Sequence, residues 1–98
     1  MGGRARSSGL LNSGTTVVSS GAQTLSGVIV LSDSVNPATI TVYDNASAAS
    51  GTILARLTAT VNTGANSLAL VTPIRAENGL VVSITGTGTP TGLILYGA

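Results

Sequence analysis

The sequence predicts one all-β domain, folded as an antiparallel sandwich or a small barrel. Short β-branched runs recur at roughly ten-residue spacing with turn residues between them, which is typical of these folds. Several runs alternate apolar and polar residues, as a strand with one buried face does. The chain has 98 residues, a length that supports one domain with one small core.

The first 14 residues are expected to form a flexible, irregular arm. Glycine and serine interrupt this segment so often that neither a helical nor a strand period can be followed. From Thr15 onward the sequence changes to β-branched runs separated by Gly, Asn, Asp and Pro. We therefore expect an arm at residues 1–14 and a sandwich domain at residues 15–98.

Seven strands are expected after the arm. The third alternates strictly, with Ile40 and Val42 on one face, and the fourth alternates in a way that predicts Ile53 inside and Leu54 outside. The expected strands span residues 15–19, 24–32, 38–44, 52–61, 67–72, 79–85 and 91–96. Asn-Gly before the sixth strand favours a tight turn with positive φ.

The residue inventory argues against an enzyme. The chain has no His, no Cys and no Lys, and general acid–base or covalent catalysis depends mainly on these groups or on an activated Ser or carboxylate. The carboxylic side chains are Asp33, Asp44 and Glu77. Charged residues make up 7% of the chain, against about 25% in typical soluble domains. We expect no catalytic residues and no cofactor.

Two ligand-binding alternatives rest on few residues. Asp33 and Asp44 each lie in a turn with an Asn, and their oxygens would have to converge to bind calcium, which takes six to eight oxygen ligands. Such residues more commonly bond the backbone of their own turn, so we expect no metal site. Tyr43 and Tyr96 are the aromatic residues of the chain, a narrow platform for a carbohydrate-binding module.

Composition favours self-association over binding to nucleic acid or membrane. The mean hydropathy is +0.50 and the net charge +1, whereas a small soluble domain usually carries a net charge of about 2–8. Without disulfides or a zinc site, association is the remaining way to stabilise a small core. The alternative is a sheet surface kept soluble by Ser and Thr hydroxyls. No basic stripe, secretory signal or apolar run of about 20 residues appears.

Five residues are candidates for an interface. Arg56 is expected on the outer face of its strand, where it either pairs with an acidic residue across a subunit boundary or lies solvated over its own sheet. In the arm, Arg4 and Arg6 are expected to meet acidic groups of a partner, and Leu10 and Leu11 to fill a groove. The alternative for the arm is a leader without contacts.

Three connected motifs carry a resemblance to a known group of proteins. Residues 38–47 read ATITVYDNAS, residues 51–55 read GTILA, and residues 72–82 read TPIRAENGLVV. The last expected strand ends in LILY at residues 93–96. This arrangement resembles small structural proteins of tailed bacteriophages, in which a T-V-Y-D-N-x-S strand and loop precede a P-I-x-x-x-N-G-L-x-V turn and strand. The resemblance covers roughly residues 24–97 and includes no catalytic residues.

The resemblance implies a head decoration (cement) protein, with a tail, neck or fibre component as the alternative. We therefore expect a jelly-roll-like β-sandwich that assembles as a homo-oligomer, with a trimer favoured. Its partner would be the major capsid protein or another virion protein. Such a protein is made in the host cytoplasm and located on the capsid surface, and it stabilises the assembled shell by mass action because it binds only that state.

Overall fold

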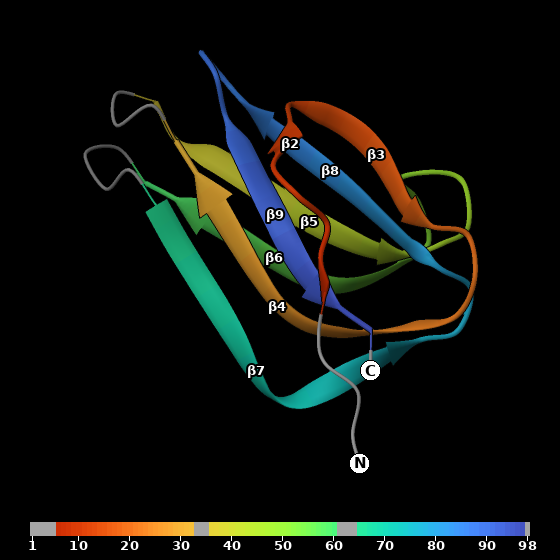
Figure 1. The fold of residues 1–98 in the computed structure, drawn as a ribbon. Helices are drawn as coiled ribbons and strands as arrows, with labels where there is room; N and C mark the ends of the chain where they lie inside the picture. Colours follow the sequence, from red (N-terminus) through yellow and green to blue (C-terminus); the bar gives the residue numbers. More distant parts are fainter. Residues whose placement is uncertain (1–5, 33–35, 61–64, 98) are drawn as a thin grey trace.

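Two antiparallel sheets pack face to face (Figure 1). The computed structural model describes residues 6–32, 36–60 and 65–97, with the backbone alone at residues 68–73. Sheet A contains β1 (Arg6–Ser7), β2 (Leu11–Asn12), β4 (Gln23–Leu31), β7 (Ala65–Ala76) and β9 (Thr91–Tyr96). Sheet B contains β3 (Gly14–Ser19), β5 (Ala38–Asp44), β6 (Thr52–Ala59) and β8 (Leu80–Gly86). The described residues include no helix, so the predicted all-β sandwich is confirmed.

The strands pair in nested order. The β5–β6 hairpin is innermost, β4 pairs with β7, β3 pairs with β8, and β1 and β2 both pair with β9. The remaining pairs, β4 with β9 and β5 with β8, join these hairpins into the two sheets. Counted with β1 and β2 as one interrupted strand, eight strands follow the nested pairing of a jelly roll. The expected jelly-roll-like arrangement is present in this strand order.

The segment before Thr15 is attached to sheet A. β1 and β2 lie along the edge of β9 that faces away from β4, and Gly14 already belongs to β3. The sequence predicts an irregular arm over residues 1–14. In the structure, residues 6–14 include the short strands β1 and β2 and the first residue of β3, and only the residues between these strands are irregular. A strand of two residues is too short for an alternating pattern, so the sequence shows no sign of the pairing.

The predicted strand boundaries agree best where turn residues clearly bound the run. β5 and β9 have the predicted limits, residues 38–44 and 91–96. The largest difference is β7, which was expected to end at residue 72 but runs from Ala65 to Ala76 through Pro73. Because β7 is an edge strand, the missing N–H of a proline need not interrupt pairing on both sides.

β7 also changes its register with β4. Leu25 pairs with Ile74, and Gly27 pairs with Ala69, so β7 advances five residues while β4 advances two. Figure 1 shows the sharp bend that β7 makes along its length. The turn predicted from residue 73 to residue 79 is therefore confined to the residues after Ala76.

The core between the sheets is aliphatic. Its members come from both sheets and include the large residues that are fully buried on β4, β5, β8 and β9. They are Leu25, Val28, Val30, Ala38, Ile40, Val42, Ala55, Ala59, Ala76, Leu80, Val82, Ile84 and Ile94. Tyr96, partly buried, packs against this cluster.

A β-bulge near the start of β6 reverses the predicted side-chain phase at Ile53 and Leu54, while the residues from Ala55 to Ala59 keep it. Val42 pairs with Ala55, but the next residue, Tyr43, pairs with Ile53, so Leu54 is the extra residue. Leu54 packs against the core, and Ile53 is 45% exposed. The prediction of Ile53 inside and Leu54 outside is wrong, because an inserted residue shifts the two-residue period by one position.

A second bulge keeps β4 in phase with the core. Leu25 pairs with Tyr96 of β9 and Gly27 pairs with Leu95, which leaves Ser26 as the extra residue. Leu25 and Val28 are both fully buried, although they lie three positions apart on one strand. The bulge therefore lets β4 supply the core on both sides of the irregularity.

The bulge in β6 predicts different outcomes for two neighbouring substitutions. Leu54→Asp places a charge against the core and should lower the free energy of unfolding by about 2 kcal/mol or more. Ile53→Asp changes an exposed side chain and should lower it by less than about 1 kcal/mol. Urea unfolding measures both values, and a Leu54→Asp variant as stable as Ile53→Asp contradicts the bulge.

Candidate interaction surfaces

Cross-strand register places an apolar row on the outer face of sheet B. Val17 of β3 pairs with Val81 of β8, Val81 pairs with Tyr43 of β5, and Tyr43 pairs with Ile53 of β6. Paired residues of neighbouring strands lie on the same face. Val17 and Ile53 are each 45% exposed, Tyr43 is half-buried and Val81 is covered. These four residues, the outer apolar row, cross all four strands of sheet B, and the row is most exposed at its two ends, Val17 and Ile53.

A polar row containing Arg56 lies beside the outer apolar row. Arg56 pairs with Thr41, which pairs with Ser83, which in turn pairs with Thr15. Arg56 is exposed, on the face predicted for it, and its Nε donates a hydrogen bond of 3.3 Å to Oγ1 of Thr41. The side chain therefore lies over its own sheet. A pairing of Arg56 with an acidic residue of a partner stays a prediction.

The outer face of sheet A is also apolar. Its central side chains alternate along β4 and β9 with the core residues Val28, Val30 and Ile94, and each is half-buried. They are Ile29, Leu31, Leu93 and Leu95. Neither β4 nor β9 contains a charged residue. Both sheets therefore present non-polar outer surfaces, which suit protein–protein contact better than contact with an ion.

The described interface candidates of the arm differ in exposure. Arg4 lies outside the described residues. Arg6 is exposed in β1 and pairs with Tyr96. Leu10 is 61% exposed between β1 and β2, whereas Leu11 packs against the core of the sandwich. Leu10 thus remains available to a partner, and Leu11 is occupied within the fold.

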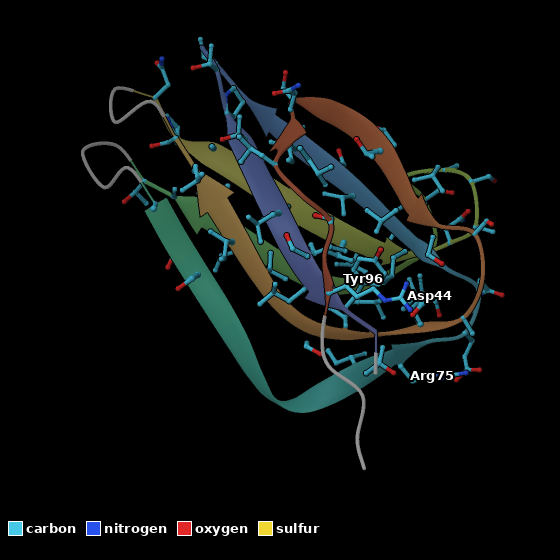
Figure 2. All side chains as sticks on the ribbon, in the orientation of Figure 1. Asp44, Arg75 and Tyr96 are labelled. Atoms are coloured by element: carbon cyan, nitrogen blue, oxygen red, sulfur yellow. The ribbon has the colours of Figure 1, made fainter. Side chains whose placement is uncertain are left out.

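Charged side chains gather at one end of the sandwich. Figure 2 shows Asp44, Arg75 and Tyr96 at this end. Glu77 lies here too, because its backbone N–H donates to Asp44, and Arg6 lies here because it pairs with Tyr96. Among the described residues, Arg56 is the charged side chain located elsewhere.

The Asp44 carboxylate joins the end of β5 to the turn between β7 and β8. Its Oδ1 accepts a hydrogen bond of 2.8 Å from the backbone N–H of Asn78, and its Oδ2 accepts one of 3.2 Å from that of Glu77. These bonds, above all the one from Asn78, favour the ionised form and hold the pKa of Asp44 below its usual value of 3.8. Asp44 therefore acts as a structural acceptor.

Asn45 organises the loop that follows. Its Oδ1 accepts hydrogen bonds from the backbone N–H groups of Ser47, at 2.9 Å, and Ala48, at 3.0 Å. Its Nδ2 donates to the carbonyl oxygen of Ser50 at 3.1 Å. This is the turn role that the sequence favours over calcium binding for an Asn in such a loop.

The described residues contain neither a cluster that could hold a metal ion nor a pocket for a small molecule. Asp33, the second carboxylate of the calcium alternative, lies outside the residues that the structure describes. Within the described part of the chain, no helix has the length and hydropathy of a membrane span.

No family model, curated protein or solved structure matches the chain. Its surfaces are therefore interpreted from their own geometry. Sequence reasoning missed the outer apolar row, because the row depends on cross-strand register. The sequence feature that could have indicated the row is two adjacent apolar residues within one strand, as in Val17-Val18, Ile53-Leu54 and Val81-Val82. Neighbouring residues of a regular strand face opposite sides, so such pairs indicate one apolar residue on each face.

The lowered pKa of Asp44 predicts an acid-dependent component of stability. Because its pKa is lower in the folded chain than in the unfolded chain, the carboxylate stabilises the fold above about pH 4, and this contribution is lost as the pH falls through the folded pKa. The difference in free energy of unfolding between the wild type and Asp44→Asn should be constant near neutral pH and shrink below about pH 4.

Denaturant unfolding at several pH values measures this difference. Glu77→Gln is the matched control, because Asp44 accepts from the backbone N–H of Glu77 and keeps both bonds in that variant. A difference between wild type and Asp44→Asn that does not change with pH contradicts the assigned role.

The backbone around Gly79 leaves no room for a side chain at this position. A Cβ at this position would lie 2.5 Å from the carbonyl oxygen of Ser19 and 2.7 Å from that of Asn45. Gly79→Ala should therefore lower the free energy of unfolding by about 1–3 kcal/mol. Gly21→Ala is the control, since nothing lies within 4 Å of its Cβ position. Equal melting temperatures for the two variants would contradict this prediction, because the turn would then accommodate the extra Cβ without loss of stability.

Proposed function

We propose that this chain is a decoration protein of tailed-bacteriophage heads, which binds the assembled shell as a homo-oligomer and stabilises it. The proposal starts from the resemblance of its strand and turn motifs to small phage structural proteins. The observation that carries it furthest is the outer apolar row, which crosses all four strands of sheet B and exposes a non-polar side chain at each end.

The chemistry of the surface favours a structural role. Exposed non-polar side chains on a sheet face can mark a place where another protein packs. The outer apolar row ends in two exposed side chains, Val17 and Ile53, and the polar row beside it offers hydroxyls and the guanidinium of Arg56. An apolar strip with a polar margin is the usual arrangement of a protein interface.

Jelly-roll topology agrees with the proposal, because viral capsid proteins are among the proteins that use it. A decoration protein needs binding sites that exist only after shell assembly, so that its binding free energy adds to the stability of the assembled shell. We assign the outer face of sheet B to the contact with the major capsid protein. A tail, neck or fibre location is the alternative.

A binding assay with separated virion parts tests the proposal. We expect the purified protein to co-sediment with heads that lack it and to raise their melting temperature, and to stay in the supernatant with isolated tails. Co-sedimentation with tails alone would favour the alternative. Binding to neither part, or binding only to a glycan array, contradicts the proposal.

A matched pair of variants tests the assigned surface. Val17→Asp changes one exposed end of the outer apolar row and should weaken head binding roughly tenfold. Ser67→Asp changes an exposed residue of β7 in sheet A, away from the assigned face, and should leave binding within about twofold of the wild type. Equal affinities for the two variants would assign head binding to another surface.

A further inference from the structure

We propose that the arm segment, residues 6–12, is exchanged between copies of this chain, so that β1 and β2 of one copy pair with β9 of the next. This inference does not rest on the proposed function, because it follows from the strand connections alone. In the exchanged assembly, each copy completes sheet A of its neighbour.

The first observation is the short connection between β2 and β3. β2 ends at Asn12 in sheet A, and β3 begins at Gly14 in sheet B, so Ser13 is the whole connection. Two residue steps span at most about 7 Å, whereas packed sheets lie about 10 Å apart. The link must therefore draw the two sheets together at this corner, and Gly14 takes a φ of 110° there. Short links of this kind favour exchange of the segment between chains.

The second observation is the limited pairing of the arm. β1 and β2 contribute two register pairs each, and the ladder between them is interrupted. Within the interruption, Ser8 donates its backbone N–H to the carbonyl oxygen of Ile94 at 2.9 Å, and its Oγ accepts from the N–H of Ile94 at 3.0 Å. Gly9 has a φ of 76°. The arm is thus held by a few local contacts and can leave β9 without opening the core strands.

These contacts favour a second copy of this chain as the partner that exchanges arms. The arm fits β9 through a specific register and through Leu11, which packs against the core. An identical chain offers the same edge and the same apolar site, so exchange conserves every arm contact. Straightening the chain at Ser13 joins β2 and β3 into one strand and relieves the tight corner. Exchange of an identical element is a recognised low-cost route to oligomers.

Cysteine cross-linking distinguishes exchange from pairing within one chain, because the native chain has no Cys. Asn12 and Thr91 are register partners, and Cα atoms of antiparallel partners lie within the range that a disulfide spans. The double variant Asn12→Cys/Thr91→Cys is oxidised and run on a denaturing, non-reducing gel. Thr39→Cys/Thr58→Cys is the control, since these partners lie on one hairpin with their hydroxyl oxygens 3.1 Å apart.

We expect the Asn12→Cys/Thr91→Cys variant to run as disulfide-linked multimers that reductant converts to monomers, while the Thr39→Cys/Thr58→Cys control runs as an internally cross-linked monomer. An internally cross-linked monomer of the Asn12→Cys/Thr91→Cys variant overturns the proposal. Thiols that stay free at both substituted positions after oxidation also overturn it, because the arm then pairs with no β9 at all.

A longer link supplies the second test. Four residues, Gly-Ser-Gly-Ser, are inserted between Ser13 and Gly14 in the Asn12→Cys/Thr91→Cys background. The longer connection lets the arm reach its own β9 without drawing the sheets together, so the cross-link should change from between chains to within one chain. Multimers that persist unchanged would show that the short connection does not drive exchange, which contradicts the argument.

Discussion

The packing of aliphatic side chains between the two sheets is the interaction on which the rest of the structure depends. The largest fully buried side chains are Leu, Ile and Val, with no disulfide in the chain to reinforce them. These side chains pack closely across the core. At Gly92 of sheet A a Cβ would lie 3.1 Å from Cδ1 of Ile40 of sheet B, so the Ile40 side chain occupies the space that the glycine leaves.

The irregular features of the sheets follow from the same constraint. The bulge at Ser26 keeps both Leu25 and Val28 in the core, and the bulge at Leu54 brings that side chain inward and turns Ile53 outward. Each bulge therefore keeps an apolar side chain in the core, and the bulge at Leu54 also changes which side chain lies on the outer face. The outer apolar row exists because Ile53 is moved to the outer face, beside Tyr43.

The sequence was sufficient for the fold class and for the strands that clear turn residues bound. β5 has its predicted limits because its alternation is strict, and β9, which contains an unbroken apolar run, has them because Pro90 and Gly97 flank it. The phase of β6 before its bulge, at Ile53 and Leu54, and the extent of β7 were predicted incorrectly, since bulges and edge positions depend on the partner strand. Of the candidate interface residues, Arg56 lies on its predicted outer face, whereas Leu11 packs against the core of the sandwich. Two-residue strands such as β1 and β2 carry no periodic signal, so sequence reasoning could not find the pairing of the arm.

We propose association as the property that connects the small core, the apolar outer faces and the low charge. A domain of this size gains little from its own core, and packing of its outer surfaces against other copies or a shell would add to its stability. Light scattering of the purified full chain at micromolar concentration tests this account most directly. The account predicts one species whose mass is a multiple of 9.5 kDa, with a trimer favoured, and a monodisperse species of 9.5 kDa would contradict it.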